Sequence, residues 1–295
     1  MGDQEFNKRT TRRGCLRSGS QSLLGAVLCG GLPNFGKLRT AETKTAEQPD
    51  RATKKDWHPN EFHKMVALGE STTAGGWSSS RERCWVSELA SLINDFQSHK
   101  MEFFNAGIGA NVISTRSPAY ENSGKPAANE RLEKHVIARH PDLLIISYGL
   151  NDARGGTPID LFRKELVAII KQIRQHIQPL IILLGPYYMT DFTVGGKCWS
   201  HADLTLFKRF NKAIAEVSVQ EKCLYVDVLA ANGETDWMVH FDGVHANDLG
   251  HRIIANRIFE VLAQNSSGLA RKTKQAEKTS PRWRDESTLK ADYGF

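Results

Sequence analysis

Leu143-Leu144-Ile145-Ile146-Ser147-Tyr148 is a short, almost uninterrupted apolar run, and Gly149-Leu150-Asn151-Asp152 follows it directly. A run of this length and composition, ending at a glycine, is typical of a strand that is buried on both faces of a parallel sheet. Polar residues placed immediately after such a strand lie at its carboxyl end. The stretch therefore predicts both the centre of a sheet and one edge of a functional site.

The same pattern repeats on either side of this run. Further strands are predicted at residues 65–68, 101–104 (stopped by Asn105-Ala106-Gly107), 180–184 and 224–226. Segments with apolar residues at helical spacing alternate with them, at 85–96, 127–140, 158–173, 203–219 and 247–264. Strands that alternate with helices predict an α/β fold, a three-layer α/β/α sandwich around a central parallel sheet of about five strands.

Three residues in the predicted loops can form a nucleophilic site. Ser71 follows the first strand, in Gly69-Glu70-Ser71, and a serine hydroxyl needs a histidine base to act as a nucleophile. In Asp242-Gly243-Val244-His245, the carboxylate can accept the Nδ1 proton of the imidazole and leave Nε2 free as that base. Each feature has an ordinary explanation when taken alone: Ser71 could cap a helix, and an Asp-x-x-His spacing can arise by chance.

Acyl transfer also needs hydrogen-bond donors for the oxyanion that develops on the carbonyl oxygen. Asn151 can offer its side-chain amide, although an asparagine after a strand also commonly closes a turn. The segment Asn105-Ala106-Gly107-Ile108-Gly109-Ala110-Asn111 can offer backbone N–H groups. It does not fit a dinucleotide-binding loop, because Val112 stands where the third glycine of that motif belongs.

Taken in order, these segments resemble the four sequence blocks of the SGNH hydrolase superfamily, the GDSL esterases and lipases. The resemblance covers about residues 64–264, and the blocks are Gly69-Glu70-Ser71, Asn105 to Ala110, Gly149 to Asp152, and Asp242 to His245. Two positions depart from the family pattern. Glu70 replaces the aspartate of the first block, and Ala110 replaces a glycine of the second.

The resemblance implies a flavodoxin-like SGNH hydrolase fold and a serine esterase without a metal or organic cofactor. It implies a triad of Ser71, His245 and Asp242, with an acyl-enzyme on Ser71. The oxyanion hole would consist of the backbone N–H groups of Ser71 and Ala110 and the side chain of Asn151, with Gly109 as the alternative to Ala110. The expected substrates are small-molecule or carbohydrate esters, with short-acyl, sugar-acetyl or aryl esters favoured.

Two other functions remain open on the sequence. Asp236, His240, Asp242 and His245 could bind a metal ion in a metal-dependent hydrolase, although no second cluster of ligands supports this. A non-catalytic, carbohydrate-binding pseudo-esterase is the other alternative. Trp77 and Trp237 lie in or near the predicted rim loops, where they could stack on a substrate or simply pack onto the sheet.

The distribution of charge argues against a nucleic-acid partner. The chain has 295 residues and a formal charge of +6. Residues 1–60 carry 11 Lys or Arg and 6 Asp or Glu, and residues 266–295 carry 7 and 4, so residues 61–265 sum to −2. The basic excess therefore lies at the two ends. The sequence predicts a basic leader and linker at 1–60, one hydrolase domain at 61–265 and a basic, disordered tail at 266–295.

The leader resembles an export signal. Arg12-Arg13 precedes a modestly apolar stretch at residues 23–32, as in a twin-arginine signal, although Cys15 is a departure and no clean cleavage site follows. Export to the periplasm or the medium is the favoured localisation, and the cytoplasm is the alternative. No apolar run is long enough for a transmembrane helix. The five cysteines are too few for a disulfide scaffold and contain no C-x-x-C pair.

Overall fold

The computed structural model describes residues 54–280. Residues 1–53 of the predicted leader and linker and residues 281–295 of the predicted tail lie outside this range. The strands are β1 (Lys64–Gly69), β2 (Glu102–Gly107), β3 (Leu143–Ser147), β4 (Leu180–Leu184) and β5 (Leu224–Val226). The α-helices are α1 (Ser71–Ala74), α2 (Trp85–Asp95), α3 (Leu132–His135), α4 (Leu150–Arg154), α5 (Ile159–His176), α6 (Leu204–Gln220), α7 (Val228–Asn232), α8 (Asp248–Asn265) and α9 (Arg271–Ala276).

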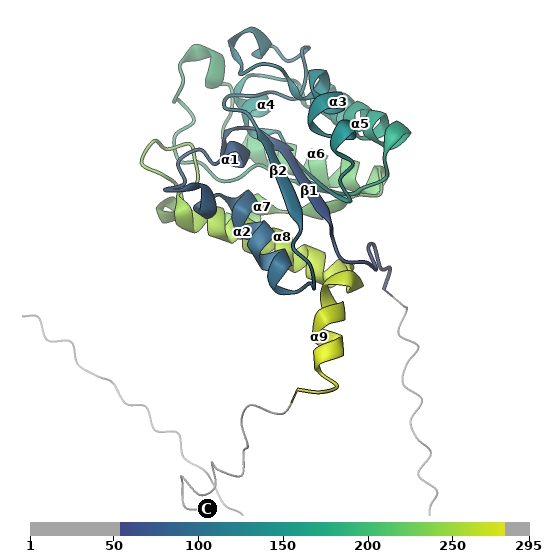
Figure 1. The fold of residues 1–295 in the computed structure, drawn as a ribbon. Helices are drawn as coiled ribbons and strands as arrows, with labels where there is room; N and C mark the ends of the chain where they lie inside the picture. The colour runs from purple at the N-terminus through teal and green to yellow at the C-terminus, as the bar shows by residue number, and fades with distance from the viewer. Residues whose placement is uncertain (1–53, 281–295) are drawn as a thin grey trace, which may run out of the picture. The chain divides into compact units, whose positions relative to one another are not determined.

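The five strands form one parallel sheet in the order β2-β1-β3-β4-β5. Every residue of β3 and β4 is buried, as their continuous apolar sequence predicts. Figure 1 shows α2 and α8 side by side on one side of the sheet and α5 and α6 together on the other. The predicted three-layer α/β/α architecture is therefore confirmed.

The strand order places the site. The chain moves from β1 outward to β2 and then returns past β1 to β3, so the direction of winding reverses between β1 and β3. Loops that leave two neighbouring strands at such a point separate from each other and open a crevice at the carboxyl ends of the strands. Gly69 ends β1 and pairs with Ser147 at the end of β3, so the segments carrying Ser71 and Asn151 begin on opposite sides of this crevice.

Two sequence predictions differ from the structure near the site. The strand predicted to stop before Asn105 continues through Gly107, because pairing with β1 extends to Gly69↔Gly107. The helix predicted at 127–140 is broken into a 3₁₀ turn, α3 and a second 3₁₀ turn. The breaks fall at Arg131 and Val136, whose φ angles of −121° and −125° are not helical. At Arg131 the break accompanies the burial of a charged side chain against the sheet.

The predicted tail also begins later than expected. Ser266 and Leu269 are buried, and α9 follows them. The backbone N–H of Gly268 donates to the carbonyl oxygen of His58, and the N–H of Ser267 donates to Asp56. Residues 267–270 form a 3₁₀ turn that leads into α9, and residues 266–269 pack on the segment that leads into β1. No helix of the described chain is long and apolar enough to cross a membrane.

Candidate active site

Ser71 is the first residue of α1, and only Glu70 separates it from the end of β1. The turn is tight because β2 passes directly under α1: a Cβ added to Gly107 would lie 2.0 Å from the backbone nitrogen of Ala74. Only glycine fits there. The backbone N–H of Gly76 donates to the carbonyl oxygen of Ser71 at 2.8 Å and closes the short helix. Ser71 is thereby presented at the carboxyl edge of the sheet.

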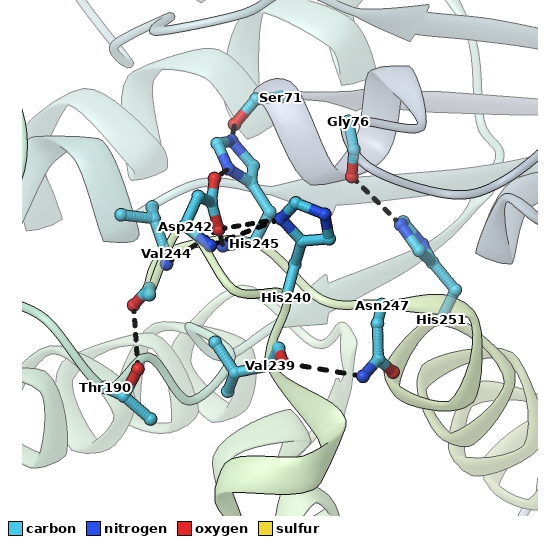
Figure 2. A network of polar contacts seen from close by, with 11 residues as sticks. Ser71, Gly76, Thr190, Val239, His240, Asp242, Val244, His245, Asn247 and His251 are labelled. Atoms are coloured by element: carbon cyan, nitrogen blue, oxygen red, sulfur yellow. Dashed lines mark hydrogen bonds and ion pairs between the residues drawn. The ribbon is translucent and has the colours of Figure 1, made fainter.

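The loop before α8 brings Asp242 and His245 to this serine. The Nε2 atom of His245 lies 2.8 Å from the Ser71 hydroxyl, and its Nδ1 lies 2.5 Å from Asp242 Oδ2. Figure 2 shows the imidazole between the carboxylate and the serine. A hydroxyl, an imidazole and a carboxylate in this order can move a proton from Ser71 to His245 and stabilise the resulting imidazolium.

The backbone of the loop fixes the geometry of the pair. The N–H groups of Val244 and His245 both donate to Asp242 Oδ1 at 3.1 Å, and the loop is pinned by the bond from His240 N–H to the His245 carbonyl oxygen at 2.7 Å. Burial by itself would raise the pKa of Asp242. The hydrogen bonds from His245 and Val244 outweigh this and hold its pKa below the usual value. Asp242 is therefore ionised at neutral pH.

Asn247 holds the far end of the same loop. Its Oδ1 accepts from the N–H of Gly250 and so caps α8, while its Nδ2 donates to the Trp237 carbonyl oxygen at 2.8 Å. His251, on the next turn, is fully buried. Its Nδ1 accepts from Trp85 N–H at 3.3 Å, so its Nε2 carries the proton for the Gly76 carbonyl oxygen at 3.2 Å (Figure 2). It packs beneath the site and does not act as a second base.

The candidate oxyanion donors lie next to one another. Asn151 is buried, and its Nδ2 donates to the carbonyl oxygen of Asn111 at 3.2 Å, beside Ala110. Because the amide has two N–H bonds, one is left for a substrate oxygen. Ala110 is exposed, and no described residue accepts a hydrogen bond from its N–H. It adopts φ of +52°, the left-handed region that favours glycine, whereas Gly109 has no positive φ. Ala110 therefore has the left-handed backbone conformation that a glycine at this position of the second block would readily adopt.

Glu70 links two of the sequence blocks. Its side chain is 1% exposed, and its Oε2 accepts the backbone N–H of Asn151 at 3.1 Å. Burial raises the pKa of Glu70 to about 8, and the nearby Asp152 also raises it. Burial likewise raises the pKa of Asp152 to about 7. The glutamate therefore holds the third block against the first in a largely protonated form at neutral pH.

We expect Glu70→Gln to flatten the dependence of stability on pH. Since the folded pKa of about 8 lies above the unfolded value of 4.5, Glu70 stabilises the fold fully below the unfolded value, and this contribution is lost as pH rises to the folded value. The melting temperature of the wild type should therefore fall from about pH 5 to about pH 9 by more than that of the variant. Thermal melts at several pH values measure this. Asp152 leaves a residual slope in both proteins, and equal slopes would contradict the assignment.

An aromatic cluster adjoins the triad. The Trp77 ring stacks on His240 at 4.4 Å with 17° between the planes, and its centroid lies 6.4 Å from that of His245. Trp77 is 52% exposed and has φ of +65°, which is strained for a large side chain. Phe241, which is 90% exposed, packs on the rings of Trp77 and His240. Trp237 is also exposed, but it makes no ring contact with this cluster among the described residues.

The alternative metal site is not assembled. The Asp236 carboxylate lies 3.3 Å from the Tyr188 hydroxyl, while His240 and His245 are grouped around Asp242. Within residues 54–280, no group of three or more His, Cys, Asp or Glu side chains, the His240–Asp242–His245 group included, is arranged so that it could hold a metal ion.

Comparison with known proteins fixes the family. A model of the GDSL-like lipase/acylhydrolase family matches residues 67–253, which include all four blocks. The chain belongs to this family. No curated protein sequence matches it.

Solved structures of esterases and lipases share the fold. A lipase/acylhydrolase from Enterococcus faecalis is 22% identical, with a TM-score of 0.54 over 68% of this chain and 96% of the other. An acetylxylan esterase from Geobacillus stearothermophilus is 19% identical, with a TM-score of 0.51 over 69% and 95%. An α/β hydrolase from the metagenome of Lake Arreo is 19% identical, with a TM-score of 0.52 over 68% and 95%. These neighbours share the fold of this chain, and the family to which it belongs supports an ester hydrolase.

Sequence reasoning missed the residues that support the site from below. Arg131, Tyr148 and the side chain of Asn111 are buried against the ends of β1, β2 and β3. Nothing local in the sequence marks them, because Arg131 lies in a segment with helical spacing and Tyr148 reads as the end of a strand. The sequence marks His240 only as a possible metal ligand, and its stacking on Trp77 has no sequence signal.

Proposed function

We propose that the protein is a serine esterase that hydrolyses carboxylic esters through an acyl-enzyme on Ser71. The observation that carries this proposal is the continuous Ser71–His245–Asp242 hydrogen-bond chain, built from segments 174 residues apart in the sequence. Such a chain at the carboxyl edge of an α/β sheet provides a nucleophile, a base and an orienting carboxylate together.

The reaction follows from the geometry. His245 Nε2 accepts the Ser71 proton as Oγ bonds to the ester carbonyl carbon, and the carbonyl oxygen becomes an oxyanion. The N–H groups of Ser71 and Ala110 and the Asn151 amide would donate to it. His245 then gives its proton to the departing alcohol oxygen. Water, activated by the same imidazole, attacks the acyl-enzyme and releases the carboxylic acid and free Ser71.

A direct assay tests this function. The full-length protein is expected to hydrolyse p-nitrophenyl acetate and butyrate faster than the octanoate, with no loss of rate in EDTA. Loss of activity in EDTA, restored by a divalent metal, would instead support the metal-dependent alternative. A folded protein that hydrolyses no ester but binds oligosaccharides would be a carbohydrate-binding pseudo-esterase.

For the substrate, we propose an ester of a sugar or an aryl alcohol with a short acyl group. The exposed face of the Trp77–His240 stack offers a flat aromatic surface beside His245, where the leaving alcohol departs. An aryl ring, or the C–H face of a sugar ring, can bury apolar area on such a surface. The acetylxylan esterase among the structural neighbours acts on a carbohydrate ester, which agrees with this choice.

We expect Trp77→Ala to raise KM for acetylated xylooligosaccharides about fivefold, since the loss of one stacking surface costs about 1 kcal/mol. Hydrolysis of methyl acetate, which has no ring, should change little. Trp237→Ala is the matched control, because Trp237 is similarly exposed but lies outside the aromatic cluster. If Trp77→Ala and Trp237→Ala raise KM for the oligosaccharides equally, Trp77 does not bind the alcohol. The same conclusion follows if Trp77→Ala impairs methyl acetate hydrolysis as much as oligosaccharide hydrolysis.

We further propose that the protein is exported. The Arg12-Arg13 pair before an apolar stretch supports this proposal. Sequencing the amino terminus of the protein recovered from its native host tests it: a start within about the first 60 residues but after the apolar stretch is expected, and a start at Met1 or Gly2 would count against export.

A further inference from the structure

The guanidinium of Arg131 is buried beneath the candidate oxyanion hole. The residue is 2% exposed, and within residues 54–280 no carboxylate lies within ion-pair distance of it. Instead, Nη1 donates to the carbonyl oxygen of Ala106, and Nη2 to that of Gly69 at 3.0 Å. These carbonyl groups belong to the next-to-last residue of β2 and the last residue of β1. The cation therefore joins the ends of the two strands from which the first and second sequence blocks leave the sheet.

The same guanidinium reaches Asn111 directly and through Tyr148. Nη2 lies 3.0 Å from Asn111 Oδ1 and 2.6 Å from the Tyr148 hydroxyl, which in turn donates to Asn111 Oδ1 at 2.5 Å. Asn111 Nδ2 donates to the carbonyl oxygens of Gly124 at 2.6 Å and Pro126 at 2.8 Å. The Asn111 side chain is fully buried and has every donor and acceptor engaged.

Asn111 touches both non-serine donors of the candidate oxyanion hole. Ala110 directly precedes Asn111 in the chain, and the backbone carbonyl oxygen of Asn111 accepts from the Asn151 side-chain amide. The left-handed conformation of Ala110 is unfavourable for a residue other than glycine, so it persists only where its neighbours enforce it. On one side Gly124 N–H binds the Ala110 carbonyl oxygen at 3.0 Å, and on the other Asn111 is anchored to Arg131 and Tyr148.

We propose that Arg131, Tyr148 and Asn111 are positioning residues that hold the Ala110 N–H and the Asn151 amide in the geometry of the oxyanion hole. The inference rests on the proposed esterase function. It assigns to these three buried side chains a role in transition-state stabilisation beyond packing. Small displacements of oxyanion donors are costly, because hydrogen bonds to the developing charge depend steeply on geometry.

Tyr148→Phe tests the proposal with little risk to the fold. Without the hydroxyl, Asn111 Oδ1 still accepts from Arg131, and Arg131 keeps its carbonyl acceptors, so no buried group loses its last partner. With p-nitrophenyl acetate we expect kcat to fall about tenfold with KM changed by less than about twofold, since loosening a donor costs less than the hundredfold or more of removing one. Inhibition by phenylboronic acid, whose adduct with serine carries an oxygen in the oxyanion hole, should weaken by a similar factor.

Tyr225→Phe is the matched control. The Tyr225 hydroxyl, on β5, also donates to an asparagine Oδ1 at 2.5 Å, that of Asn211, but far along the sheet from Ser71. This variant should keep kcat and the boronate inhibition constant. The proposal is overturned if Tyr148→Phe leaves both values unchanged, or if the two variants lower kcat equally. Should Tyr148→Phe fail to fold, Arg131→Lys is measured instead with the same expectations and the same overturning results.

Failure of the proposed positioning role can be distinguished from failure of the proposed esterase function. If Ser71→Ala retains wild-type activity, the esterase mechanism itself is wrong. If Ser71→Ala is inactive while Tyr148→Phe is unchanged in kcat and boronate affinity, the mechanism stands and only the positioning role is wrong.

Discussion

Replacing Ser71 with alanine is expected to lower kcat for p-nitrophenyl acetate by about a thousandfold or more. The hydroxyl that lies 2.8 Å from His245 Nε2 is the atom that would carry the acyl group, and the methyl group of alanine cannot replace it. A residual rate above that of water is expected, because the oxyanion donors and the imidazole remain in place. Steady-state kinetics with each variant at equal concentration, together with a thermal melt, provide the measurement.

Ser78→Ala is the matched control for this variant. Ser78 lies just beyond α1, and its hydroxyl is within hydrogen-bond distance of the carbonyl oxygens of Gly75 and Ser80 rather than of the triad. Its loss should leave kcat within about twofold of the wild type. If Ser71→Ala keeps more than about a tenth of the activity while folded, an acyl-enzyme on Ser71 is untenable.

Asp242→Asn is expected to lower kcat by about a hundredfold to ten-thousandfold with little change in KM. The carboxylate accepts from His245 Nδ1 and from two backbone N–H groups. An amide at this position can present its NH₂ to Nδ1, which favours the imidazole tautomer that has its proton on Nε2. Nε2 could then no longer accept the Ser71 proton. The imidazolium formed during the reaction would also lose its counter-charge.

The activity of Asp236→Asn distinguishes the triad mechanism from metal-dependent catalysis. Asp236 lies in the same segment but contacts Tyr188, outside the triad. The triad mechanism predicts an activity close to that of the wild type. A comparable loss in Asp236→Asn, His240→Ala and Asp242→Asn, reversed by added metal, would favour the metal-dependent alternative.

Much of the fold follows from local patterns in the sequence. Short apolar runs identified β1, β3, β4 and β5, since buried strands contain few polar residues, and the apolar residues Met101, Phe103 and Phe104 around Glu102 identified the edge strand β2. The spacing of Phe162, Leu166 and Ile169 correctly predicted α5, because helical periodicity reflects burial of one face. The exceptions lie where tertiary contacts override local preference. At Arg131, bonds to the ends of β1 and β2 accompany the break in a helix that the spacing predicts.

The candidate site was predictable to a different extent. Ser71, Asp242, His245 and Asn151 could be named because each stands just after a strand or in the loop before α8, where loops of a parallel sheet converge. The contact of Glu70 with Asn151, the left-handed conformation of Ala110 and the stacking of Trp77 on His240 depend on segments distant in the sequence. No local periodicity encodes such contacts, so they became visible only in the fold.

Labelling with a fluorophosphonate tests the central claim most directly. Such a reagent phosphonylates an activated serine and mimics the tetrahedral intermediate, so the nucleophile can be located by digestion and mass spectrometry. The account predicts one phosphonyl group per protein, on Ser71, with activity lost in proportion to labelling and no labelling in Asp242→Asn on the same time scale. Complete inactivation with Ser71 unmodified, or an active esterase that the reagent does not label, would contradict it.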